Sequence, residues 1–195
     1  MYTNAIKREW SVVEKRPELA RKIYISYPTK VFQGREDIQF DILNKISMFF
    51  NVPFSSVQVI GSAKTGYSYV KQKDFLEGKS DLDISIINSE LFMRYMELSY
   101  RVTKGYKDLS KFPRDKEGKS VDSYYKKCIA NGIFRPDLMP TCEEKANWQA
   151  FFNKLSGEYY KLFKNINAGI YATQYFFEFK QIESLSIYME KLGGK

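Results

Sequence analysis

The sequence predicts an α+β fold in which helices flank a small mixed β-sheet. Two short apolar segments, over residues 57–60 and 80–87, are typical of buried strands. Longer segments around them repeat apolar residues at helical spacing. The chain has 195 residues and is 44% hydrophobic, so we expect a single domain with a proper core rather than disorder.

The first half of the chain supplies one helix and both of these strands. The helix covers residues 36–50, and its apolar face is marked by Ile38, Ile42, Ile46 and Phe49 or Phe50. Asn51-Val52-Pro53 ends it, because proline cannot continue a helix. The strand at 57–60 follows directly and runs into Gly61.

The second half is predicted to be mainly helical. Asn88-Ser89 is expected to cap a helix that continues through Tyr100. After a polar loop over 108–120, a capping box at 141–144 begins a helix that extends to about Phe163. A strand over 165–171 and an amphipathic helix over 176–192 complete the domain.

We therefore expect one domain over residues 1–195. Its core comprises about 35–90 and 163–192, and a helical insertion over about 90–162 forms a lobe beside it.

Two motifs carry the predicted chemistry. Gly61 and Ser62 follow the first strand, where glycine lets the backbone turn sharply and approach a ligand, and serine adds a hydroxyl. Asp81 and Asp83 open the second strand two residues apart, so their side chains share one face. Adjacent carboxylates repel unless a cation lies between them, and oxygen ligands suit Mg²⁺ or Mn²⁺. Lys64 and Lys79 stand next to the two motifs and are the expected contacts to a triphosphate.

This combination of Gly-Ser and Asp-x-Asp resembles the signature of the DNA polymerase β-type nucleotidyltransferase superfamily. The wider segments 59–68 and Arg135-Pro136-Asp137-Leu138-Met139-Pro140 are similar to one group of small stand-alone bacterial members. The resemblance implies a metal-dependent transfer of a nucleoside monophosphate from an NTP, such as ATP, to an acceptor hydroxyl on a protein or nucleic acid. It also implies a setting in toxin–antitoxin or phage-defence systems.

The sequence departs from this family pattern in two places. Residues 63–80 form a longer connection than the family usually has, and we expect 67–78 to be a flap over the nucleotide or a contact surface. The family's third carboxylate has no clear counterpart, because the strand at 165–171 carries asparagine where an acid is wanted. Glu178 has a suitable local pattern, but it lies at the start of a predicted helix.

Three functions therefore remain open. The first is a nucleotidyltransferase, and the second is a synthase that joins nucleotides into second-messenger oligonucleotides. The third is a catalytically impaired module that binds a nucleotide or a partner protein. A secured third acid favours the first two, and its absence favours the third.

Composition narrows the chemistry further. Histidine is absent, which excludes imidazole as a base or metal ligand. The formal net charge of +8 predicts polyanionic partners, such as a nucleoside triphosphate, tRNA or another nucleic acid. Cys128 and Cys142 are expected to be reduced, and no apolar segment is long enough for a membrane helix or a secretory signal, so we predict a cytoplasmic protein.

Overall fold

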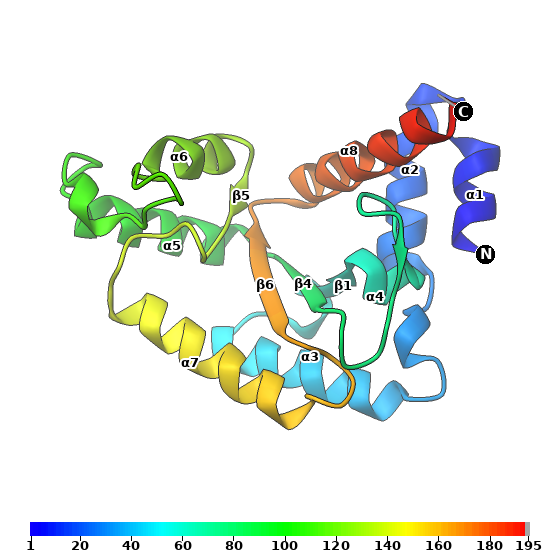
Figure 1. The fold of residues 1–195 in the computed structure, drawn as a ribbon, viewed down its shortest axis with the longest axis horizontal. Helices are drawn as coiled ribbons and strands as arrows, with labels where there is room; N and C mark the ends of the chain where they lie inside the picture. Colours follow the sequence, from blue (N-terminus) through cyan, green and yellow to red (C-terminus); the bar gives the residue numbers. More distant parts are fainter. Residues whose placement is uncertain (194–195) are drawn as a thin grey trace.

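The computed structural model describes residues 1–193 of the chain. Figure 1 shows helices arranged around a small central sheet. The helices are α1 (Tyr2–Glu9), α2 (Arg16–Arg21), α3 (Glu36–Phe50), α4 (Gly61–Thr65), α5 (Ser89–Val102), α6 (Asp122–Ala130), α7 (Glu143–Glu158) and α8 (Gln174–Gly193). The strands are β1 (Val57–Ile60), β2 (Tyr67–Ser68), β3 (Lys73–Asp74), β4 (Leu82–Ile87), β5 (Ile133–Phe134) and β6 (Ile166–Tyr171).

The main sheet is mixed, with strand order β1-β4-β6-β5. Strand β4 runs parallel to β6 and antiparallel to β1, and β5 pairs antiparallel with the end of β6. Strands β2 and β3 form a separate hairpin. The predicted α+β class, with a small mixed sheet flanked by helices, is confirmed.

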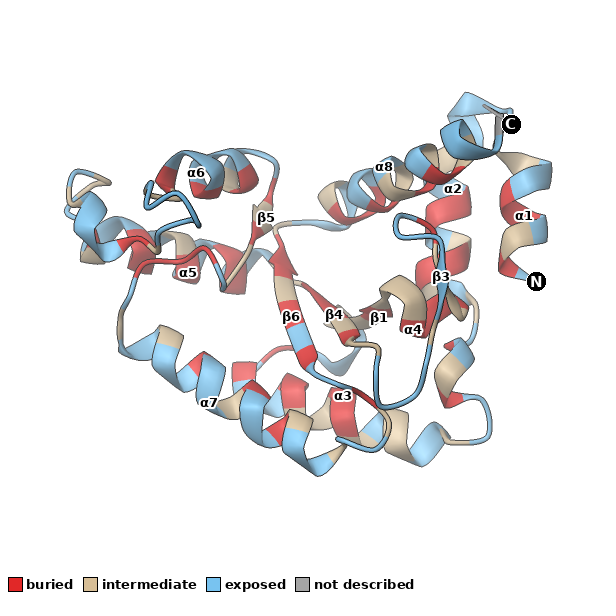
Figure 2. Ribbon diagram, in the orientation of Figure 1, coloured by how far each residue is buried: buried red, intermediate tan, exposed pale blue. Residues whose placement is uncertain are grey.

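The alternation of side chains along β4 divides the molecule into two hydrophobic cores. Leu82, Ile84 and Ile86 face the larger core, where they meet buried side chains of α3, α5 and α7. The opposite face packs, at Tyr171 of β6, against a smaller core built from α1, α2 and α8. Figure 2 shows buried stretches on these helices and on the strands between them. Asp83 of β4 is partly exposed and Asn167 of β6 is exposed, whereas Ser85 of β4 is buried.

Several expected elements agree with the structure. Helix α3 has the predicted bounds, and the Asn88 side chain accepts a hydrogen bond from the Leu91 backbone N–H at 2.8 Å, as expected for a cap. The last strand and the last helix also form, within two residues of their expected starts.

Other expectations about the helical lobe are wrong. Cys142 is the N-cap of α7 but makes no capping hydrogen bond through its side chain, so the expected capping box does not form. Helix α7 ends at Glu158, not near Phe163, because Phe163 turns back into the larger core, with its ring centroid 5.7 Å from that of Phe32. The insertion also contains β5, which joins the main sheet, and α6.

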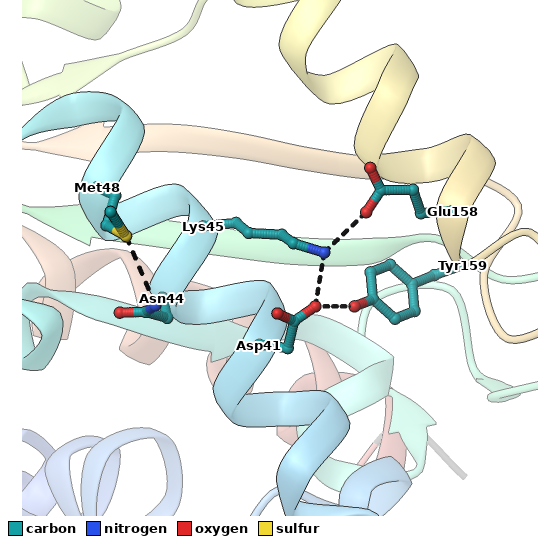
Figure 3. Close-up of polar contacts among 6 residues, drawn as sticks. All are labelled: Asp41, Asn44, Lys45, Met48, Glu158 and Tyr159. Carbon is teal, nitrogen blue, oxygen red and sulfur yellow. Dashed lines mark hydrogen bonds and ion pairs between the residues drawn. The ribbon is translucent and has the colours of Figure 1, made fainter.

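A polar cluster ties the end of α7 to α3 (Figure 3). Lys45 Nζ lies 2.7 Å from Asp41 Oδ2 and 2.8 Å from Glu158 Oε2. The Tyr159 hydroxyl hydrogen-bonds Asp41 as well. Because these charges are partly exposed, we expect each pair to contribute at most about 1 kcal/mol, but together they fix where α7 lies.

None of the helices within residues 1–193 combines the length and the apolar character needed to cross a membrane.

Candidate nucleotide and metal site

The two sequence motifs meet at the junction of β1 and α4. Ile60, the last residue of β1, pairs with Asp83 of β4. Gly61 follows with φ of +65°, and a Cβ atom built on it would lie 2.7 Å from Asp83 Oδ2. The Asp83 carboxylate therefore lies directly against the Gly61 backbone, and only glycine provides both the left-handed conformation and the space.

Helix α4 is a single short turn that begins at this glycine. Ser62 is partly exposed, and its carbonyl accepts a hydrogen bond from the Gly66 N–H at 2.8 Å. The Thr65 hydroxyl donates to the Tyr67 carbonyl at 2.7 Å and so fixes the exit of the turn. The turn thus holds Ser62 next to Gly61, close to the Asp83 carboxylate.

Asparagines, not a third acid, lie beside the two aspartates. Asp81 immediately precedes β4, and its Oδ1 accepts a hydrogen bond from Asn165 Nδ2 at 2.9 Å. Asp83 lies opposite Asn167 in the register of β4 and β6. The strand position next to the acidic pair is therefore neutral.

The electrostatic surroundings of Asp83 favour its protonated form. Burial raises the pKa of the Asp83 carboxyl, the Asp81 charge raises it further, and the Lys71 charge partly opposes the shift. A desolvated carboxylate beside a second acid is the kind of group that a bound cation stabilises.

Glu178 is not part of this site. Its carboxylate accepts hydrogen bonds from Arg21 at 2.8 and 3.2 Å and from Gln174 at 2.6 Å, and the residue is only 6% exposed. It joins α8 to α2. Within residues 1–193, no three Cys, Asp or Glu side chains gather into a possible metal site. The available donors are the Asp81 and Asp83 carboxylates, with the neutral Asn167 beside them.

The two lysines that we expected to contact the triphosphate, Lys64 and Lys79, differ in their surroundings. Lys64 is buried, and its Nζ donates to the Tyr27 carbonyl at 2.6 Å. It lines a small cavity of about 150 Å³ between α3 and the segment 25–33, which does not include Asp83. Burial lowers the pKa of Lys64 to about 8. Lys79 is exposed, in the connection that leads to Asp81.

The long connection after α4 forms the β2–β3 hairpin. Tyr69 is buried in the smaller core, with its ring centroid 4.8 Å from that of Tyr188 on α8. Lys191 Nζ donates to the Val70 carbonyl at 3.0 Å. The turn of the hairpin is thus anchored on α8 through Tyr69 and Val70, and the same turn carries Lys71, whose charge acts on Asp83. Sequence reasoning did not single out Lys71, because its closeness to Asp83 depends on this packing.

A cleft of about 780 Å³ opens beside Asn167 of β6 and Asn165, which immediately precedes this strand. Its floor includes Asp83 and Asn167, and its walls come from α6, α7, α8 and the loop at 135–137. The volume falls in the range of about 300–1,000 Å³ that is usual for ligand sites. Gly61, Ser62 and Asp81 do not line this cleft, so Asp83 is the residue of the two motifs that reaches it.

The loop that contains Arg135 belongs to this cleft. Arg135 forms a bidentate pair with Asp137, at 3.1 and 2.6 Å, and donates to the Tyr124 hydroxyl at 3.2 Å. The local sequence favours a rigid structural loop here, and the observed pairing within the loop agrees with that interpretation. Its place on the cleft wall could not be read from the local pattern.

Comparisons with protein-family models, with curated proteins and with solved structures gave no match to this chain.

Proposed function

We propose that the protein is a metal-dependent nucleotidyltransferase that moves a nucleoside monophosphate from an NTP to an acceptor hydroxyl. The observation that supports it best is the contact between the two motifs, in which Asp83 Oδ2 lies 2.7 Å from the position that a Cβ atom on Gly61 would take. A glycine turn and a carboxylate pair that touch can act on the same triphosphate.

Each residue of the site has a distinct proposed role. Gly61 and Ser62 contact the triphosphate, the first through its backbone and the second through its hydroxyl. Asp81 and Asp83 hold the divalent cation, and Asn167 is placed to add a neutral amide oxygen. Mg²⁺ or Mn²⁺ bound there would neutralise phosphate charge and polarise the phosphoryl group under attack.

Two carboxylates are fewer than the three that the resembling family uses, so we propose one cation that arrives with the nucleotide. The raised pKa of Asp83 fits this order of binding, because a partly desolvated acid pair gains most from a cation. Lys71 at the hairpin tip adds the positive charge that Lys64, hydrogen-bonded to Tyr27, does not supply.

A second candidate function is a nucleotide-binding module without turnover. The observation that favours it is the placement of Asn165 and Asn167 beside the acid pair, where a third carboxylate would be needed for two cations. A synthase of second-messenger oligonucleotides is the remaining alternative, and it differs from the transferase only in its acceptor.

We also propose a cytoplasmic setting, where nucleoside triphosphates are abundant and Cys128 and Cys142, both free, stay reduced. A toxin–antitoxin or phage-defence role is part of this proposal and is supported only by the sequence resemblance.

The decisive experiment measures nucleotide binding and pyrophosphate release while Mg²⁺ or Mn²⁺ is titrated with each NTP. Wild type is compared with Asp81→Ala/Asp83→Ala and with Asp74→Ala, a control that removes an exposed acid of the nearby hairpin. We expect metal-dependent release from wild type and the control, and none from the double variant. Normal release from the double variant would refute the catalytic assignment.

Labelled nucleotides then separate the remaining functions. Label on a macromolecule indicates a transferase, and free oligomers indicate a synthase. Metal-dependent nucleotide binding without release of pyrophosphate, with any acceptor offered, indicates the binding module.

A further inference from the structure

Two helices present similar faces to opposite sides of the large cleft. The cleft-lining residues recur at helical spacing on each helix, so a single stripe of each faces the cavity. On α6 these residues are Tyr124, Lys127 and Cys128, followed by the C-cap Asn131, and on α8 they are Phe176, Phe179, Lys180 and Glu183. The α6 stripe thus carries one aromatic ring and a lysine, and the α8 stripe carries two rings and a lysine.

The cleft has large aromatic rings that are not packed into either core. Tyr124 is 50% exposed and Phe179 is 52% exposed. Tyr175, which is 70% exposed, stacks on Phe179 with 6.4 Å between ring centroids and 21° between ring planes. Exposed rings gathered at the mouth of a cleft are typical of a binding surface, whereas scattered ones need no explanation.

Positive charge accompanies the rings. Lys127 has no ion pair within residues 1–193, and the Arg135 guanidinium lies 5.6 Å from the centroid of the Tyr124 ring. The full set of charged side chains that line the cleft comprises the cations Lys127, Arg135, Lys145 and Lys180 and the acids Asp83, Asp137 and Glu183. Arg135 and Lys180 are paired with Asp137 and Glu183, at 2.6 and 2.8 Å, so the lining as a whole has four cations against three acids.

Exposed rings next to lysine and arginine suit a ligand that has flat faces and phosphates. Single-stranded nucleic acid has both, because its bases can leave the stack and rest on aromatic side chains. A duplex hides its base faces and would meet only the charges. The chain's net charge of +8 adds a general attraction for such a polyanion.

We infer that this cleft binds single-stranded nucleic acid, with bases stacked on Tyr124 and Phe179 and phosphates near Lys127 and Lys180. The inference rests on the proposed function in one respect only, namely that the bound strand is the acceptor and that its end reaches Asp83 at the floor. The binding itself requires no catalysis.

The test is fluorescence anisotropy with short labelled single strands of RNA and DNA, using the full chain in EDTA so that no turnover occurs. Tyr124→Ala and Phe179→Ala should each weaken binding at least about 5-fold, the lower end of a stacking contribution of about 1 kcal/mol per base. Lys127→Gln should reduce the slope of log affinity against log salt by about 0.7, the value for one phosphate contact.

Matched controls make the result specific. Tyr160→Ala removes a ring that is 64% exposed but lies outside the cleft, and Lys154→Gln removes a lysine of α7 that does not line it. Both should bind like wild type. An equal loss in Tyr160→Ala, equal affinity for a duplex, or equal affinity for a polyglutamate peptide would overturn the inference in favour of general charge attraction.

The same assay distinguishes this inference from the proposed function. Asp81→Ala/Asp83→Ala should keep strand binding while losing pyrophosphate release. Wild type that releases pyrophosphate but binds no single strand would refute the strand site and leave the transferase intact.

Discussion

Replacing Gly61 with alanine tests the contact on which the candidate site depends. The backbone at Gly61 has φ of +65°, which costs an L-residue about 1–2 kcal/mol. The new methyl group would also lie 2.7 Å from Asp83 Oδ2, so the carboxylate has to move from its rotamer, at a cost of about 0.5–1.5 kcal/mol. We expect Gly61→Ala to lower the free energy of unfolding by about 1.5–3.5 kcal/mol, the sum of these two costs.

Gly34→Ala is the matched control for the free-energy cost of placing alanine at a positive φ. Gly34 has φ of +77°, and a Cβ atom added to it would meet nothing within 4 Å, so only the conformational cost applies. Urea unfolding measures the stability of both glycine variants, of Asp83→Ala and of the double variant Gly61→Ala/Asp83→Ala. The double-mutant cycle at Gly61 and Asp83 then gives the coupling free energy between these two residues. We expect a coupling of at least about 0.5 kcal/mol, because removing the carboxylate relieves the clash. If Gly61→Ala costs no more than Gly34→Ala, and the coupling is zero, Asp83 does not lie against the turn.

Three further results are expected. Asp83→Asn in EDTA should be more stable than wild type at pH 7, because the raised pKa of Asp83 means that the ionised carboxylate destabilises the folded state. This advantage should vanish below the ordinary carboxyl pKa, where Asp83 is protonated in both states. A difference in melting temperature that stays constant from pH 3.5 to 7 would contradict this. Lys64→Met should also make the protein more stable at pH 7, because the pKa of Lys64 in the folded state, about 8, lies below the usual 10.5. The stability of the wild type should rise as pH increases between these two values, so the melting temperatures of wild type and variant should converge. A difference that does not narrow by pH 10 would refute the buried, poorly solvated amine. Glu178→Gln should lower the urea midpoint by an amount equivalent to about 1–2 kcal/mol, because the charged pair between Glu178 and Arg21 is lost. Metal-dependent nucleotide binding should stay unchanged. Weakened metal binding would instead make Glu178 a metal ligand.

The parts of the fold that sequence reasoning predicted well are those fixed by local periodicity. The alternation of Leu82, Ile84 and Ile86 defined β4 and placed Asp83 on the opposite face, where the structure has it. Helix α3 was bounded correctly because a clear apolar stripe ends at Asn51, which has the left-handed conformation typical of a helix end.

The parts that it missed depend on contacts between distant segments. Strand β5 has only two residues, and it is a strand because it pairs with the end of β6. Lys64 stands two residues after Ser62, yet the rotation of the α4 turn directs its amine to Tyr27 on the other side. Both α6 and α8 line the cleft, and no local sequence pattern in either helix predicts a shared cavity.

The path of the chain between β4 and β6 separates two kinds of change. These strands are parallel neighbours, and everything from α5 to α7 is inserted in the crossover that connects them. Asp83 and Asn167 belong to β4 and β6 themselves, whereas Tyr124 and Lys127 belong to α6, which is part of the crossover. Substitutions in the crossover can therefore alter which ligand enters while the reacting end of the sheet keeps its geometry, and exchange of this segment between related chains would be a direct route to new ligand preferences.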